Sequence, residues 1–147
     1  TYGEPMAVAP LPQVRAVLDY ALTEAAPEKL FLGLPLYGYD WPLPYEAGVT
    51  KAETLSSQQA TERAARLGAE IHFDETAQSP YYHYFDPARR EHEVWFEDAR
   101  SLEQKLRLAA ENGLQGVGCW HLGRALAQFW PLLDALADIE VIPRESP

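Results

Sequence analysis

The sequence predicts an α/β fold that carries a small α+β insertion. Two near-continuous apolar runs, at 29–36 and 114–120, each follow a helical pattern, as expected for parallel strands that are covered on both faces. Between them, short β-rich segments separated by turn residues indicate a small antiparallel sheet at 70–97. The 147 residues suffice for one domain whose core buries roughly 70% of the surface of the unfolded chain.

The first predicted elements are a helix and a strand. Apolar residues at helical spacing predict an amphipathic helix over 12–25, which Pro27 ends. The strand over 29–36 should stop at Pro35, because proline cannot donate a hydrogen bond to a neighbouring strand. An aromatic-rich loop is expected to follow, and rings beside a carboxylate at a strand end suit a sugar site. The residues of this loop are Tyr37, Tyr39, Asp40 and Trp41.

The middle of the chain predicts a helix and a small sheet. Ser56 or Ser57 can cap the helix, and Gly68 is its C-terminal stop. Three short segments beyond the helix are predicted to be antiparallel strands, because they are rich in β-forming residues and separated by proline turns. These segments are 70–74, 80–85 and 92–97.

The last predicted elements are a helix, a strand and a final helix. Ser101 and Gln104 have the spacing of a capping box and predict a helix to about Asn112, with Asp98 capping or supporting its first turn. A second buried strand is predicted to end at Trp120. The final helix is expected to turn these apolar side chains inward: Leu126, Phe129, Trp130, Leu133 and Leu136.

Charge and composition exclude several classes of function. The formal net charge of −10 and the lack of a basic face argue against a nucleic-acid partner. The apolar runs are too short to span a membrane. Cys119 is the only cysteine, so no internal disulfide forms, and its apolar strand predicts an inert buried thiol. The histidines and their neighbouring acids match no tight ligand set, so neither a metal nor a cofactor is expected.

Two parallel strands alone leave open edges, and open edges invite pairing with another chain. Either further strands belong to the same sheet or a partner supplies them, so a homo-oligomer formed through the edges is expected. The first residues show neither an initiator methionine nor a signal-peptide pattern, and the chain is interpreted as a piece of a longer protein.

Five stretches of the chain together resemble family 18 glycoside hydrolases, which are chitinase-like enzymes. The resemblance is greatest to bacterial cell-wall members that act on spore cortex peptidoglycan as N-acetylglucosaminidases. The stretches lie between about Pro5 and Trp130 and are spaced as in the family. They read PMAVAPLPQVRAVLDYAL, KLFLGLPLYGYDWPLPY, IHFDETAQSPYYHYFD, HEVWFEDARSLEQK and GLQGVGCWHLG.

The resemblance implies that the chain is the C-terminal portion of a TIM (β/α)8 barrel, since a complete barrel needs about 250 residues. Residues 29–36 would be strand seven and residues 115–120 strand eight. Residues 1–47 and 101–147 would then form the barrel segment, and residues 48–100 the α+β insertion subdomain. The family's members further imply a secreted, cell-wall or spore-associated location, about which the chain itself says nothing.

The resemblance also implies a reaction. The parent protein would cleave β-1,4 links beside N-acetylglucosamine in peptidoglycan or chitin, with the substrate's own acetamido oxygen attacking the anomeric carbon. That chemistry needs an acid from the motif Asp-x-x-Asp-x-Glu, yet no aspartate of this chain has another aspartate three positions later. The family's Met-x-Tyr-Asp element is also absent. The chain alone is therefore expected to lack a catalytic residue and to bind sugar without hydrolysing it.

The resemblance further suggests which residues contact N-acetylglucosamine. Trp120 matches the tryptophan that forms the floor beneath the cleaved sugar, with a place in the core as the alternative. Tyr37 and Trp41 either line the cleft or pack beneath the insertion. Asp40 either accepts hydrogen bonds from sugar hydroxyls or is an exposed loop carboxylate. Tyr82 is assigned to a wall of the cleft, with core packing as the alternative.

Two other functions stay open. A non-catalytic glycan-binding or assembly module would use the same rings, and a purely structural α/β domain would use none of them. Glu97 is a polar candidate near the predicted cleft wall and is expected to be solvated. Adjacent carboxylates such as Glu97 and Asp98 do not suit a two-acid glycosidase, because successive strand residues point to opposite faces.

Overall fold

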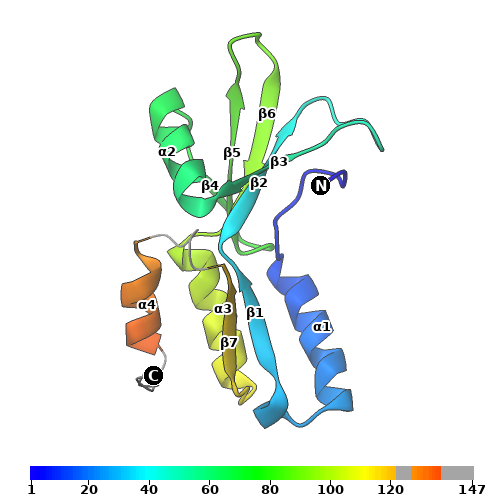
Figure 1. The fold of residues 1–147 in the computed structure, drawn as a ribbon, viewed down its shortest axis with the longest axis vertical. Coiled ribbons are helices and arrows are strands. Elements are labelled where there is room, and N and C mark those ends of the chain that lie inside the picture. Colours follow the sequence, from blue (N-terminus) through cyan, green and yellow to red (C-terminus); the bar gives the residue numbers. More distant parts are fainter. Residues whose placement is uncertain (122–126, 137–147) are drawn as a thin grey trace, which may run out of the picture.

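The computed structural model of the chain describes residues 1–121 and 127–136, and it has a mixed α/β fold with two sheets. A two-stranded parallel sheet lies below a five-stranded antiparallel sheet, and the chain passes directly from one to the other (Figure 1). The strand order of the larger sheet is β3-β2-β6-β5-β4. Each sheet packs against its own helices, so the fold has two hydrophobic cores.

The lower part of the molecule is built on the parallel pair. β1 pairs with β7 over its whole length, from Phe31 opposite Gly116 to Pro35 opposite Trp120. Buried side chains of β1, α3 and α4 form its core, including Leu34, Leu102 and Phe129. The elements of this part are α1 (Leu11–Glu24), β1 (Phe31–Pro35), α3 (Ala99–Glu111), β7 (Gly116–Trp120) and α4 (Phe129–Leu136), with a 3-10 turn at Pro27–Lys29.

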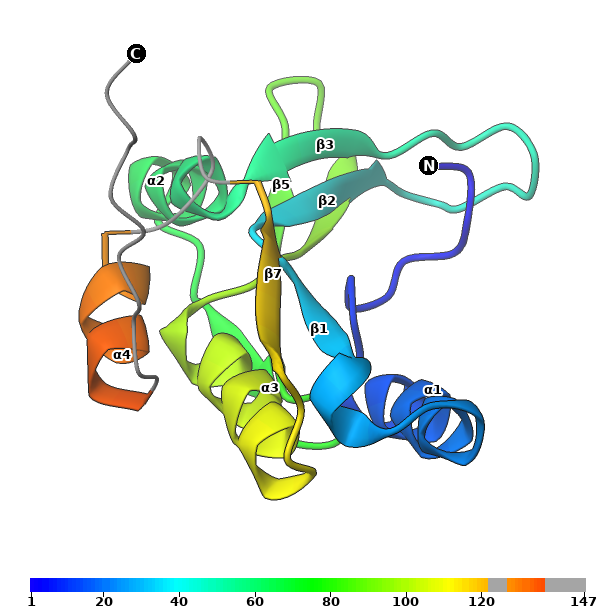
Figure 2. The same ribbon diagram turned by 60° about the horizontal axis from the view of Figure 1, so that its bottom comes forward.

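The upper part is the antiparallel sheet, and helix α2 covers one of its faces (Figures 1 and 2). The core between the helix and the sheet contains Leu55, Ala60, Tyr82, Val94 and Phe96, each no more than 1% exposed. The elements are β2 (Tyr37–Pro42), β3 (Glu53–Ser56), α2 (Ser57–Leu67), β4 (His72–Asp74), β5 (Ser79–Phe85) and β6 (Glu91–Trp95).

The helix ends confirm two of the three capping predictions and correct the third. The Ser56 side chain accepts a hydrogen bond from the backbone of Gln59, and the Gln59 side chain accepts one from Ser56, which completes a capping box. Gly68 closes α2 in the left-handed conformation that glycine adopts without strain. Asp98 caps α3, as expected, but it forms the capping box with Ser101 at N3, so the predicted box between Ser101 and Gln104 is wrong.

The prediction of an aromatic loop after the first strand is wrong. Residues 37–42 form strand β2, which pairs with β3 on one side and β6 on the other. Only Leu36 separates β1 from β2. The strand exists because partners from two distant parts of the chain satisfy its backbone, and the local sequence does not reveal those partners.

The second parallel strand is less buried than its apolar sequence predicts. Trp120 of β7 is 72% exposed, and Phe31 of β1 is 65% exposed. Each of these strands has a hydrogen-bonded neighbour on one side only in the described part of the chain. In the final helix Phe129 is buried and Leu133 is half-buried, but Trp130 and Leu136 are 48% and 37% exposed and do not turn inward. Leu126, predicted for the same helix, lies outside the described residues.

The proposed division into a barrel segment and an insertion stays a prediction, although the larger sheet does include β2 from before residue 48. Among the described residues, no helix has both the length and the apolar character needed to cross a membrane.

Candidate functional site

A hollow of about 350 Å3 opens where the two sheets meet. It lies at the C-terminal end of β7 and at the start of β2. The hydrogen bond from the Leu36 amide to the Trp120 carbonyl, 2.8 Å long, ties the two strands together at this point. The residues that line the hollow are Tyr37, Tyr39, Thr54, Trp120 and His121.

Alternation along β2 places two tyrosine rings at this hollow. Tyr37 and Tyr39 are two residues apart, so their side chains lie on the same face of the sheet, with ring centroids 5.6 Å apart in a T-shaped arrangement. Trp120 comes from the other sheet, and its indole meets the His121 ring edge to face at 6.0 Å. The hollow therefore offers aromatic surface and polar ring atoms, and none of its lining residues is a carboxylate.

Trp41 supports this site but does not line it. The side chain is 2% exposed, and its indole N–H donates to the carbonyl oxygen of Gly3 at 2.8 Å. The rings of Trp41 and Tyr39 pack in a T-shaped arrangement with their centroids 5.4 Å apart. Of the two positions considered for Trp41, the structure places it in packing, where it holds the Tyr39 ring.

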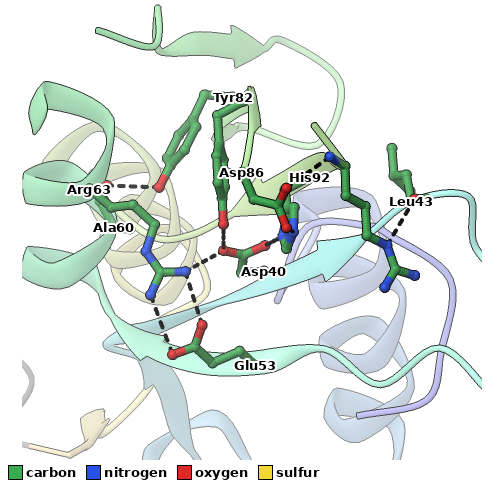
Figure 3. A network of polar contacts seen from close by, with 10 residues as sticks. Asp40, Leu43, Glu53, Ala60, Arg63, Tyr82, Asp86 and His92 are labelled. Atoms are coloured by element: carbon green, nitrogen blue, oxygen red, sulfur yellow. Dashed lines mark hydrogen bonds and ion pairs between the residues drawn. The ribbon is translucent and has the colours of Figure 1, made fainter. Parts of the chain in front are cut away.

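Asp40 is neither at the hollow nor in an exposed loop, which corrects both interpretations of this residue. It lies on β2 between Tyr39 and Trp41, so its side chain points to the opposite face, and it is 2% exposed. Oδ1 lies 2.7 Å from Nδ1 of His92. Oδ2 accepts hydrogen bonds from Arg63 and from the hydroxyl of Tyr84, the latter at 2.7 Å (Figure 3 shows the network around the carboxylate).

Further charges surround this buried carboxylate. Arg63 also binds Glu53, with nitrogen–oxygen distances of 3.0 and 3.3 Å. Nε2 of His92 lies 3.6 Å from a carboxylate oxygen of Asp86 (Figure 3). Burial, together with the hydrogen bond to Asp40, raises the pKa of Tyr84 well above the ordinary phenol value. Tyr84 therefore stays protonated at neutral pH and donates to Asp40, so the network ties β2 to α2, β5 and β6.

Tyr82 belongs to the core and not to a cleft wall. It is fully buried, and its hydroxyl donates to the carbonyl oxygen of Ala60 at 3.0 Å (Figure 3). The Tyr82 ring packs against Phe96 with centroids 6.0 Å apart. Burial raises its pKa above the ordinary phenol value. The alternation of β5 decides the matter, because Tyr82 points toward α2 whereas its neighbour Tyr81 points to the open face.

Two further expectations from the sequence concern Glu97 and Cys119, whose ionisable side chains are fully and partly buried. Glu97 is not solvated: it is fully buried, and one carboxylate oxygen binds Nζ of Lys105 at 2.8 Å. Burial raises the pKa of Glu97, and the charge of Lys105 opposes that shift. Cys119 is half-buried, and burial likewise raises the pKa of its thiol, which disfavours the reactive thiolate.

Three residues at the hollow were not among the predicted sugar contacts. Tyr39 was named only as part of the aromatic cluster, although the two-residue period of a strand would have paired it with Tyr37. Thr54 is opposite Tyr39 in the register of β2 and β3, which the sequence does not disclose. His121 directly follows Trp120. Within residues 1–121 and 127–136, no three histidine, cysteine, aspartate or glutamate side chains are placed to share a metal ion.

Comparison with known proteins gives concordant matches. The model of the family described as "Glycosyl hydrolases family 18" matches residues 6–125. The cortical fragment-lytic enzyme of Bacillus subtilis (strain 168) is 50% identical over 132 residues, which are 90% of this chain and 31% of that protein.

Solved structures agree with this result. The spore cortex-lytic enzyme SleL of Bacillus megaterium QM B1551 is similar with a TM-score of 0.91 and 45% identity, over 95% of this chain and 33% of that chain. A chitinase from Chromobacterium violaceum ATCC 12472 is similar with a TM-score of 0.82 and 29% identity, over 90% of this chain and 40% of that chain. The chain thus spans about a third of the length of the relatives that match it over most of its own length.

Proposed function

Because this chain belongs to glycosyl hydrolase family 18, we propose that it is the sugar-binding portion of a glycosidase that cleaves β-1,4-linked N-acetylglucosamine polymers. One observation carries the proposal. Trp120, at the C-terminal end of β7, leaves 72% of its surface open and shares a hollow with the ring of Tyr37. An exposed indole matches the apolar face of a pyranose ring, and its N–H can bond a hydroxyl.

The polymer we propose is peptidoglycan. Relatives named as cortical fragment-lytic and spore cortex-lytic enzymes support this choice over chitin, since they are more similar to this chain than the chitinase is. The protein would accordingly act in the spore or cell wall. β1 and β7 would be strands seven and eight of a barrel, and the antiparallel sheet would stand beside its mouth.

In this proposal the chain contributes to catalysis by binding and orientation. Trp120 would lie beneath the sugar whose acetamido oxygen attacks its own anomeric carbon, while Tyr37 and Tyr39 border that sugar. The proton for the leaving oxygen would come from an acid outside these residues, because the motif Asp-x-x-Asp-x-Glu is absent from them.

The role of Trp120 is tested by binding of di-N-acetylchitobiose, followed by isothermal titration calorimetry. We expect Trp120→Ala to weaken binding about tenfold or more, because a stacked ring contributes on the order of 1.5 kcal/mol. Trp130→Ala is the matched control, since Trp130 is also an exposed tryptophan but lies on α4. Equal losses in both variants, or no loss in Trp120→Ala, would count against the site.

The missing acid motif favours a second candidate function, a glycan-binding or assembly module without turnover. The two are separated by mixing this chain with a family 18 segment that contains the motif and assaying release of reducing ends. Turnover by the assembled pair, absent from either part, supports the glycosidase portion. A folded complex that binds glycan without turnover supports the module.

A further inference from the structure

His121 is the basic side chain at the hollow that contains Trp120. Among the described residues that line this hollow, no other has a basic group. The imidazole and the indole of Trp120 are nearly perpendicular, with an interplanar angle of 86° and centroids 6.0 Å apart. Because both rings line the same hollow, a sugar that stacks on the indole would meet the imidazole at its edge and not within the stack.

The imidazole of His121 is available to a ligand. The residue is exposed, and neither ring nitrogen has a hydrogen-bond partner in the described part of the chain. His83, by contrast, has Nδ1 3.2 Å from a carboxylate oxygen of Glu91. His92 likewise has Nδ1 2.7 Å from Oδ1 of Asp40. An imidazole carries at least one ring N–H whether it is neutral or protonated, so His121 offers a donor that the fold does not use.

Acidic side chains next to the hollow in the sequence point away from it. These acids are Asp40 and Glu53, which are opposite each other in the register of β2 and β3 and both bind Arg63 on the covered face. None of the residues that line the hollow is a carboxylate. The lining therefore holds no negative side chain that would repel an anionic group, although the chain as a whole has a net charge of −10.

N-acetylmuramic acid is the sugar that distinguishes peptidoglycan from chitin. It alternates with N-acetylglucosamine, and it carries a lactyl ether whose carboxyl group is either free or amide-linked to a stem peptide. Within the glycan, an N-acetylglucosamine on Trp120 would therefore have a lactyl group on the neighbouring sugar at either side. The lactyl carbonyl oxygen accepts hydrogen bonds in both forms, and a contact made with this group alone would discriminate between the two polymers.

We propose that His121 is a specificity-determining residue, whose imidazole N–H donates to the lactyl carbonyl oxygen of the N-acetylmuramic acid next to the sugar on Trp120. The inference deepens the proposed function and rests on it. The hydroxyls of Tyr39 and Thr54 both donate and accept, so they suit the sugar hydroxyls that the two polymers share. The imidazole instead supplies a donor for the group that chitin lacks, and a charged acceptor makes such a hydrogen bond stronger.

The test uses two disaccharides that differ only in the lactyl group, N-acetylglucosaminyl-β-1,4-N-acetylmuramic acid and di-N-acetylchitobiose. Isothermal titration calorimetry on the full chain measures both affinities. We expect the muramic acid disaccharide to bind about tenfold more tightly, because its carboxylate is a charged acceptor. His121→Phe keeps a planar ring but removes the N–H, so it should abolish this preference and leave the affinity for di-N-acetylchitobiose unchanged. His121→Gln keeps a donor and should restore part of the preference.

His83→Phe is the matched control, because His83 is also an exposed histidine but lies on β5 and does not line the hollow. It should leave both affinities unchanged. A third ligand, in which the lactyl carboxyl is amide-linked to a dipeptide, distinguishes the free carboxylate from the form that bears a stem peptide. A preference for either form that His121→Phe abolishes supports the inference.

The remaining outcomes separate this inference from the function on which it rests. If Trp120→Ala weakens binding of di-N-acetylchitobiose but the parent chain prefers neither muramic acid ligand, His121 does not select the polymer and the site at Trp120 stands. If the preference exists but His121→Phe retains it, another group recognises the lactyl ether and the inference is overturned. If neither disaccharide depends on Trp120 for binding, both proposals fail.

Discussion

At the scale of single residues, neighbours along β2 have opposite roles. Tyr39 and Trp41 point to the open face, where one ring borders the hollow and the other supports it. Asp40, between them, points to the covered face and binds side chains of α2, β5 and β6. Asp40, although it lies between two aromatic residues in the sequence, is therefore a structural anchor and is not available to a ligand.

The contacts of Asp40 are expected to stabilise the fold, and a substitution at this position tests that. Asp40 accepts hydrogen bonds at both oxygens, whereas the amide of an asparagine would turn one donor toward Arg63 or His92. We expect Asp40→Asn to lower the free energy of unfolding by about 3 kcal/mol, because it leaves a partly buried guanidinium short of its counter-charge. Urea unfolding followed by circular dichroism measures this loss.

Glu53→Gln is the matched control for that measurement. It alters the other carboxylate bound to Arg63, but the Glu53 side chain is 63% exposed, so the expected loss is below about 1 kcal/mol. If the two variants were equally stable, the buried network would not hold β2 in place.

Whether the position of a residue could be predicted from the sequence depends on how far along the chain its interaction partners lie. The caps at Ser56, Gly68 and Asp98 depend only on residues a few positions away, and all three were predictable. The positions of Trp41 and Tyr82 depend on which face of a strand is covered. That in turn depends on pairing with distant segments, so the sequence left a cleft position and a packed position open for both residues, and the structure shows both side chains buried.

At the scale of elements, β2 is the segment that local patterns described least well. Its aromatic residues and flanking prolines resemble a loop, and Gly38 adds to that impression. In the structure Gly38 lies tight against Trp95 and Phe96, at the end of β6. A Cβ atom built there would lie 2.5 Å from the carbonyl oxygen of Trp95 and 2.6 Å from Cβ of Phe96.

Gly38→Ala should therefore be strongly destabilising. The added methyl group meets backbone and a buried side chain, which cannot rotate away, and we expect a loss of about 3 kcal/mol in the free energy of unfolding. Gly33→Ala, in β1, is the comparison, because no atom lies within 4 Å of its added Cβ. It should be neutral or gain about 0.5 kcal/mol, since glycine weakens a strand interior. Equal effects on thermal unfolding would refute the close approach.

At the scale of the whole molecule, the two sheets are unequally complete. The antiparallel sheet has five strands and a helix over one face, whereas the parallel sheet has two strands, each with one edge unpaired in the described residues. Beside β1, an apolar groove of about 500 Å3 separates that strand from α1. A chain that spans about a third of its relatives' length is consistent with such a surface being covered in the longer proteins.

The exposed edge and groove lead to a prediction about association. Phe31 lines the groove at the edge of β1 and is 65% exposed, so two copies can bury apolar surface and pair their free edges here. We expect the chain to sediment as a concentration-dependent oligomer, and Phe31→Glu to shift it toward monomer. Phe85→Glu adds the same charge at an equally exposed phenylalanine near the β5–β6 turn, so it should leave association unchanged. A parent chain that sediments as a compact monomer at all concentrations would contradict this prediction. If both variants shifted the oligomer toward monomer equally, the added charge, and not the edge of β1, would explain the effect.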